Sequence, residues 1–544
     1  SFTNNSILGG NLLANGQDIA LDFTDTAAIQ GNVKIAGDST LSLTGQGVGS
    51  LVTIQGSVVV EQGSSSLIDK LSLDVGGTTT VSGTMNLGAA GLAGFDFGRM
   101  NHVDVIDGGS FKLVGADGTA SRLKADFALS SPNSTALNNG STLELGNMIL
   151  DGSISVSADY NHLILTDTTV QKNVTLAGTT NVFDMTDSSI NGLLDISGGT
   201  LNLNGRNYAK SAAISGNDTE VNIGKDAVLE VDTTVVKPKG QLNVEGLLDG
   251  ALLLDGGSAT LTGMNALVSK DVTITSGLLT LTDTKTNSPI GGDLHFNGTS
   301  VSAAKAAVNS IWAFDNDVVM DGNGSLMLNE SMTLNGILTG KGQLNISGSG
   351  SLTLATAAAL KDQFTGNIDY SAGDLILGAS DVLGTIGSLN LASSSTVNMF
   401  VTGTHSKELL GNSVAMTTND NVDWKGHINQ TSLTVEGSGL SIDNRNSSID
   451  SLTVNSGGFA SAGGNTFGEV TAKANAIFNA GDKLTSSLAV FGTATQVDLN
   501  NVTASLKSVT NEGTLNLKDY SAVNVSGTMN STGTLNVIDS SLNV

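Results

Sequence analysis

One short pattern constrains this chain more than any other: two apolar residues separated by a single, usually polar residue, recurring between glycines along the sequence. The segment from Gly340 to Gly378 contains it four times, as Leu344-Asn345-Ile346, Leu352-Thr353-Leu354, Ile368-Asp369-Tyr370 and Leu375-Ile376-Leu377. Successive side chains of a strand point to opposite faces, so each triplet places two apolar side chains on one face. The pattern therefore predicts short strands joined by glycine-rich corners.

A unit this short cannot bury its own apolar pair, and stacked copies complete such a core in repeat proteins. Gly513 and Gly533 begin two copies of Gly-Thr-Leu-Asn that start 20 residues apart, with another triplet between them. We expect Leu515, Leu517, Leu535 and Val537 of these copies to face the core. Helical repeats need apolar residues at i, i+3 and i+4, which the triplets do not provide. We expect an all-β parallel β-helix, a β-solenoid, of about 25 turns and about 120 Å, at ~4.8 Å between strands. A single elongated domain over residues 1–544 is predicted, because the composition is nearly uniform.

Charge and cysteine content exclude several classes of function. The chain has 24 basic and 50 acidic residues and a net charge of −26, which argues against binding to nucleic acid or an anionic membrane. Without cysteine there is no disulfide, thiolate zinc site or cysteine nucleophile. Charged residues make up 14%, below the usual ~25%, so Ser, Thr and Asn must fill the outward positions. Asparagines on adjacent turns are expected to stack and hydrogen-bond along the solenoid.

Four stretches interrupt the pattern and predict excursions from the solenoid, at residues 89–131, 302–314, 356–364 and 401–424. The second and third are alanine-rich and predict short helices. Functional groups often lie on such segments, although a spacer or a cap over a core edge is the alternative. Trp312 and Trp424 lie in two of them and are the candidate exposed binding residues.

The search for catalytic, metal and cofactor sites finds none, and we expect no enzyme activity. The five histidines are dispersed and show no metal-binding spacing. Asp315, Asp317 and Asp321 suggest calcium, but their spacing departs from that of an EF-hand loop, which leaves a calcium site as the alternative. The stretch from Gly37 to Thr40 resembles the start of a serine-nucleophile motif without its following glycine, and a corner before a strand is the preferred interpretation.

The order Gly-Gln-Leu-Asn-Ile at 342–346, Phe-Thr-Gly at 364–366 and Gly-Asp-Leu-Ile-Leu at 373–377 closely resembles the passenger-associated repeat of autotransporters. Phe364 stands where tyrosine is usual. The match covers about 40 residues, whereas the Ser/Thr/Asn/Gly-rich triplets resemble AIDA-type adhesin passengers over nearly the whole chain. This resemblance implies a right-handed parallel β-helix carried to the surface of a Gram-negative bacterium by an outer-membrane β-barrel that is absent from this chain.

Family members include adhesins, self-associating proteins, proteases and esterases, so the fold leaves the function open. The long uncharged surface favours a cell-surface adhesin that promotes self-association, aggregation and biofilm formation, its partner being another copy on a neighbouring cell. The first alternative is an adhesin for a host matrix protein or glycan. A glycan-cleaving β-helix enzyme is disfavoured, because none of the four arginines accompanies an obvious acidic cluster on a shared strand.

Overall fold

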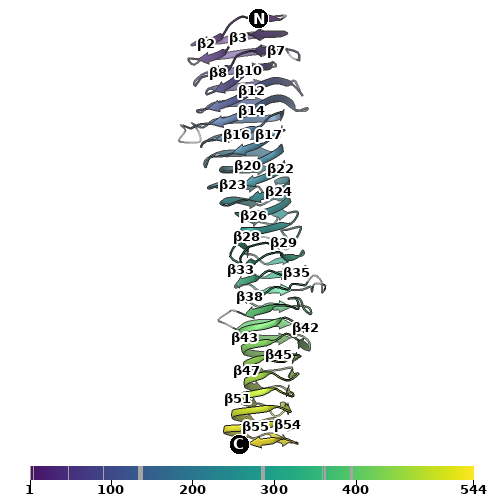
Figure 1. Ribbon diagram of the computed structural model, residues 1–544. Helices are drawn as coiled ribbons and strands as arrows, with labels where there is room; N and C mark the ends of the chain where they lie inside the picture. Colours follow the sequence, from purple (N-terminus) through teal and green to yellow (C-terminus); the bar gives the residue numbers. More distant parts are fainter. Residues whose placement is uncertain are drawn as a thin grey trace. The chain divides into compact units, whose positions relative to one another are not determined.

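The computed structural model describes residues 2–3, 5–46, 48–89, 91–132, 139–282, 288–357, 359, 363–391 and 396–544. Its strands pair in parallel and stack in coils, which makes the fold a β-solenoid of about 26 turns (Figure 1). The described residues contain no α-helix. The prediction of an all-β parallel solenoid is therefore confirmed.

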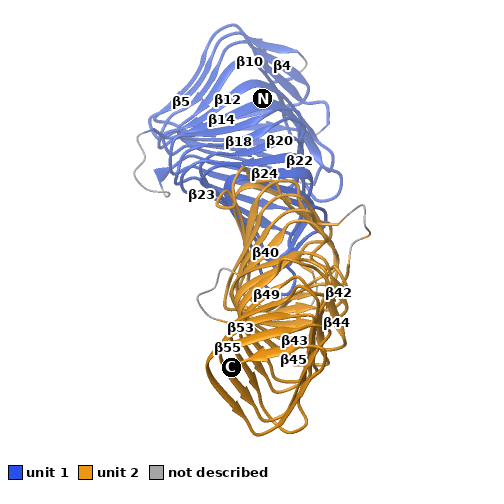
Figure 2. Ribbon diagram, turned by 60° about the horizontal axis from the view of Figure 1, so that its bottom comes forward, with its two compact units in different colours: residues 1–272 blue, residues 273–544 orange. Residues whose placement is uncertain are grey.

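The chain divides into two compact units, unit 1 from Ser1 to Val272 and unit 2 from Thr273 to Val544 (Figure 2). The single domain expected from the sequence stays a prediction.

A coil of unit 1 illustrates how the sequence builds the solenoid. Strand β17 (His162–Val170) runs along two faces, and β18 (Val174–Leu176) forms a third. Asp167 turns the chain inside β17 with a φ of 47°, in the left-handed region that Asp and Asn tolerate better than most residues. A three-residue turn and a longer one complete the coil, so each coil is three short strands joined by corners.

The core of unit 1 consists of side chains that stack in register from coil to coil. Strands β17, β19 (Val182–Thr186), β21 (Gly199–Asn204), β23 (Thr219–Ile223) and β25 (Gly240–Val244) pair in succession. One inward row comprises Leu163, Phe183, Leu201, Val221 and Leu242, none more than 2% exposed. Burial of such a side chain contributes about 1.5–3 kcal/mol relative to exposure.

Buried asparagines at a corner satisfy backbone groups that the strands leave unpaired. The backbone N–H of Asn161 donates to Oδ1 of Asn181 at 2.7 Å, and the Asn181 amide donates to the carbonyl oxygen of Ala158 at 2.6 Å. Both asparagines are almost fully buried. This arrangement follows the general requirement that buried polar groups be hydrogen-bonded.

In unit 2 the four triplets between Gly340 and Gly378 are strands, as predicted: β36 (Leu344–Gly348), β37 (Leu352–Leu354), β38 (Ile368–Ser371) and β39 (Leu375–Leu377). A separate eight-stranded parallel sheet begins at β42 (Thr404–His405). It continues through β44 (Val422–Trp424), β46 (Leu440–Ile442), β48 (Phe459–Ser461), β50 (Ala476–Phe478), β52 (Gln496–Asn500), β54 (Thr514–Lys518) and β56 (Thr534–Val537).

The expected excursions are largely wrong as secondary structure. The range 302–314 holds β30 (Ala304–Val308) and β31 (Trp312–Phe314) instead of a helix. Ala304 and Ala306 are buried on either side of exposed Lys305, and Ala307 and Val308 are buried as well. Pairing of β30 with β33 (Gly324–Leu328) in the stacked coils therefore overrides the helix propensity of alanine. In 356–364, residues 356, 357, 359, 363 and 364 are not helical, and the others lie outside the described residues.

Strands also fill most of the other two ranges. β12 (Asp96–Ile106), β13 (Ser110–Val114) and β14 (Ser121–Ser130) occupy 89–131, and β42, β43 (Glu408–Thr418) and β44 occupy 401–424. In 89–131 a bulged register of β12 with its neighbours obscures the triplet spacing, because it displaces the apolar alternation without ending the pairing.

Two residues expected in the core of the last coils are partly exposed. Leu515 and Leu517 are buried as predicted, but Leu535 is only half-buried and Val537 is 45% exposed. Strand β56 pairs with β54 alone among the described strands, so its inward side chains are covered from one side.

Candidate functional site

The tryptophans predicted as exposed binding residues are buried. Trp312 is 2% exposed and Trp424 is fully buried, and both point inward from three-residue strands of unit 2. The Trp424 indole donates from Nε1 to the carbonyl oxygen of Lys407 at 3.0 Å. Because they occupy the inward positions of strands, where the solenoid needs large apolar groups, these side chains are core residues and the prediction of exposure is wrong.

The histidines take separate structural roles. His162 pairs with Asp184 at 2.7 Å and His102 with Asp104 at 2.9 Å in unit 1, and His427 lies 3.4 Å from Glu408 in unit 2. His405 is buried, and its Nε2 lies 3.0 Å from the carbonyl oxygen of Thr402.

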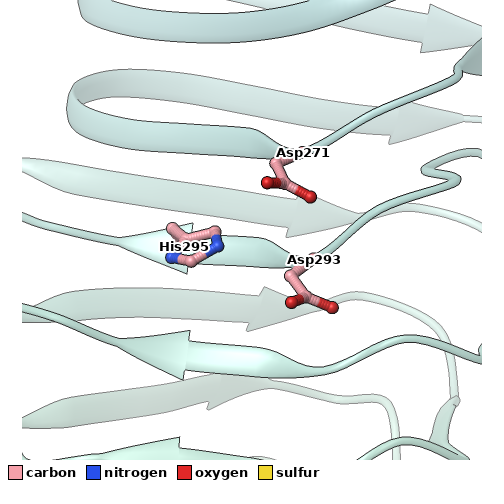
Figure 3. Close-up of side chains that lie close together, drawn as sticks. All are labelled: Asp271, Asp293 and His295. Atoms are coloured by element: carbon pink, nitrogen blue, oxygen red, sulfur yellow. The ribbon is translucent and has the colours of Figure 1, made fainter.

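The remaining histidine lies near the carboxylates of unit 2 that were considered for calcium. His295 and Asp293 lie at the start of β29 (Leu294–Phe296) (Figure 3), and His295 Nδ1 is 2.8 Å from Asp321. Asp271, which Figure 3 also labels, belongs to unit 1.

Asp315 and Asp317 have other partners. Asp315 accepts from Asn335 at 2.7 Å, and Asp317 accepts from the backbone N–H of Ile337 at 2.9 Å. The three candidate calcium ligands therefore bond to three different partners, and in the described part of the chain they do not form one cluster of carboxylates.

The serine-like motif is a corner, as preferred from the sequence. Gly37 and Asp38 adopt positive φ values of 63° and 59°, and buried Ser39 donates from Oγ to the carbonyl oxygen of Ala36 at 2.6 Å. The hydroxyl closes a turn inside the coil, where a substrate has no access.

One outward face of unit 1 carries a continuous row of polar side chains, which we call the amide face: Asp184, Asn202, Asn222 and Asn243. They are register partners on β19, β21, β23 and β25 and are half-buried. Asn202 donates to Asp184 at 2.9 Å, Asn222 to Asn202 at 3.2 Å and Asn243 to Asn222 at 2.9 Å. The stacked asparagines expected from the sequence are confirmed here.

A similar row occurs in unit 2, where Asn516 donates to Asp498 at 2.6 Å and Asn536 donates to Asn516 at 2.7 Å. Each amide has two N–H donors and two acceptor lone pairs. A ladder bond to each neighbour leaves one donor and one lone pair of a middle asparagine for water or another molecule.

A groove of about 610 Å³ lies on another part of unit 1. It follows β4 (Thr26–Ile29), β7 (Leu51–Ile54), β10 (Ser72–Val81), β12, β14 and β15 (Thr142–Leu150), which pair in this order. Figure 1 shows β10, β12 and β14 stacked one below the next. We call it the basic groove after Arg99, Arg122 and Lys124, although an equal number of carboxylates, Asp74, Asp96 and Asp151, also line it.

Sequence inspection missed this grouping. Asp74, Arg99 and Lys124 are register partners on three successive strands, and Asp96 is the partner of Arg122. The residues are far apart in the sequence, and a β-bulge in β12 shifts the pairing between Asp96 and Arg99. The sequence carried no signal of this convergence except that two of its four arginines fall in 89–131.

No helix able to cross a bilayer is found among the residues that the structure describes. A comparison with protein-family models matched none, and a comparison with curated proteins found no relative. The family resemblance noted in residues 342–377 therefore remains a prediction.

Proposed function

We infer that this chain is the passenger of an autotransporter, displayed at the surface of a Gram-negative bacterium, and that it makes cells adhere to one another through the faces of its solenoid. The support for the family is the β-solenoid fold together with the four strands that form where the passenger-like repeat lies. The support for adhesion is the amide face.

The amide face presents equivalent groups at the spacing of the coils. Neighbouring coils lie ~4.8 Å apart, so a second copy aligned with the first meets the same donors and acceptors on each turn. A single hydrogen bond between the copies contributes about 1 kcal/mol net. Many such contacts act together once the first has formed, because later contacts are intramolecular. Weak contacts in register can therefore hold two surfaces together.

Charge sets the conditions for this association. At a net charge of −26, two copies repel each other at low ionic strength. Added salt screens this repulsion over about 10 Å at 0.1 M. Clumping is therefore expected to increase with salt, whereas an association held by opposite charges would weaken.

The test uses beads or cells that carry the full chain, mixed with uncoated ones, and measures their settling at several salt concentrations. The variant Asn202→Thr, Asn222→Thr, Asn243→Thr removes three amides and keeps uncharged, strand-favouring side chains. The matched control, Asn191→Thr, Asn217→Thr, Asn265→Thr, changes three exposed asparagines elsewhere in unit 1.

We expect wild-type and control beads to clump, and the amide-face variant to stay dispersed while its circular dichroism spectrum is unchanged. Equal clumping of the amide-face variant would exclude this face. If wild-type beads stay dispersed at every salt concentration yet bind a matrix protein or glycan, self-association is wrong and adhesion to a different partner replaces it.

A further inference from the structure

The basic groove concentrates cations in a chain that has few of them. Only 24 of the 544 residues are Lys or Arg, yet two of the four arginines and one lysine line this groove. Arg99, Arg122 and Lys124 are exposed. Within the described chain no ion pair joins any of the three to a carboxylate, and Arg122 and Lys124 donate no side-chain hydrogen bond there. Their charges are therefore available to a ligand.

The local backbone directs Arg99 into the groove. Gly98 has a φ of 85°, and a Cβ atom at this position would lie 2.2 Å from the carbonyl oxygen of Leu73, so only glycine fits. The carboxylate of Asp96 accepts from the Gly98 backbone N–H at 2.8 Å, and Arg99 donates from Nε to Asn101 at 2.8 Å. Bulges of this kind commonly re-aim a side chain next to a binding site. This bond holds the guanidinium at its Nε.

The groove extends over six strands, which corresponds to about 24 Å at ~4.8 Å between neighbours. A single small anion would use only a fraction of it, so the geometry favours a chain molecule. Asp74, Asp96 and Asp151 lie among the cations and would repel a ligand with a charge on every unit, such as a nucleic acid. An extended peptide could not add as a strand, because β12 is already paired with β10 and with β14.

We propose that the basic groove binds an acidic polysaccharide, a chain of sugar units that carries carboxylate or sulfate groups at intervals. Its anionic groups pair with Arg99, Arg122 and Lys124, which as arginine and lysine recognise such oxygens by charge-assisted hydrogen bonds. Its hydroxyl groups donate to Asp74, Asp96 and Asp151. This site is separate from the amide face, so cells could bind a glycan surface with unit 1 and each other through that face.

The test is isothermal titration of the monodisperse full chain at low salt with a keratan sulfate oligosaccharide, a hyaluronate oligosaccharide, uncharged dextran and a single-stranded oligonucleotide. We expect binding of keratan sulfate, whose repeating units are charged through sulfates alone, or of hyaluronate, which carries carboxylates alone, and none of dextran or the oligonucleotide. Whichever of the two binds identifies the anionic group. Binding of neither overturns the proposal, as does equal binding of dextran or the oligonucleotide.

The variant Arg99→Gln, Arg122→Gln, Lys124→Gln is expected to bind the acidic oligosaccharide at least ten-fold more weakly. The matched control, Lys172→Gln, Arg206→Gln, Lys210→Gln, removes three exposed cations elsewhere in unit 1 and is expected to bind like wild type. Arg122→Lys keeps the charge and should retain most of the affinity. Unchanged affinity of the groove variant would place the binding elsewhere. The groove variant should clump as wild type does. Failure of this proposal is therefore distinguishable from failure of self-association.

Discussion

The ammonium nitrogen of Lys407 lies 4.7 Å from the centroid of the Phe364 ring, in the core of unit 2. It donates to the carbonyl oxygens of Gly366 at 2.9 Å and Ile386 at 2.6 Å. Phe364 is the aromatic residue of the Phe-Thr-Gly corner in the passenger-like repeat. The corner is therefore packed against a buried cation, and both partners are almost fully hidden from solvent. Burial disfavours the charged form of a lysine. The stability of unit 2 is therefore expected to depend on pH through Lys407.

Replacing Lys407 with methionine should remove a rise in stability at alkaline pH. Burial lowers the pKa of Lys407 from 10.5 to about 8. Between these values the unfolded chain binds more protons than the folded one, so the free energy of unfolding rises with pH, by about 3 kcal/mol in all. Trp312 and Trp424 both lie in unit 2, so tryptophan fluorescence during urea unfolding reports this unit. If the free energy of unfolding of Lys407→Met rose at alkaline pH as much as that of wild type, Lys407 would not be the origin of the rise.

His405 should make unit 2 sensitive to acid. Burial lowers the pKa of His405, although the backbone bond to Thr402 and the charges of Asp381 and Asp420 oppose the shift. For a base with a lowered folded pKa, the stability is present above the unfolded value of about 6.5 and is lost as the pH falls through it. The tryptophan-monitored urea midpoint is expected to drop between pH 7.5 and pH 5, and His405→Phe should drop less. An equal drop in the variant would assign the acid sensitivity to other groups.

Leu515→Asp should unfold the neighbouring coils before the rest of unit 2. Leu515 is 2% exposed and stacks between Val497 and Leu535, so the new carboxylate would be buried without a partner, which costs several kcal/mol. Contacts in a solenoid are mostly between nearest coils, which confines the damage. Hydrogen exchange should show lost protection in β52, β54 and β56, whereas Thr534→Asp, at an exposed position of β56, should change little. Uniform loss of protection along the unit would argue against local coupling.

Asn181→Ala should destabilise the corner ladder of unit 1. It removes the acceptor for the backbone N–H of Asn161 and the donors to the carbonyl oxygens of Ala158 and Ala177. Unpaired buried groups cost about 1–3 kcal/mol each, so a loss near 3 kcal/mol is expected. Hydrogen exchange of peptides covering β18 and β19 measures it. The exposed Asn191→Ala is the matched control, and an equally small effect of the two substitutions would show that the ladder is not needed.

The class of fold could be predicted because its cause is local. Leu344 and Ile346 flank Asn345, and this alternation alone specifies a strand with one apolar face, whatever lies next to it. The same holds for the row of Asn202, Asn222 and Asn243, whose outward position follows from the apolar residues on either side. The alanine-rich segment from Ala304 to Val308 was misinterpreted because alanine favours helices, whereas its pairing with the next coil, visible only in the folded chain, makes it a strand.

The amino-acid sequence by itself determined that this protein consists of stacked short strands with apolar pairs inside and amides outside, since that pattern repeats every coil. Only the tertiary structure decided which residues meet across coils. Arg99, Arg122 and Lys124 line one groove because of the length of each coil and the bulge at Gly98, and Lys407 lies over Phe364 because the stacking of coils brings their corners together. The physical reason is that side-chain direction depends on immediate neighbours, whereas register depends on every residue between two coils.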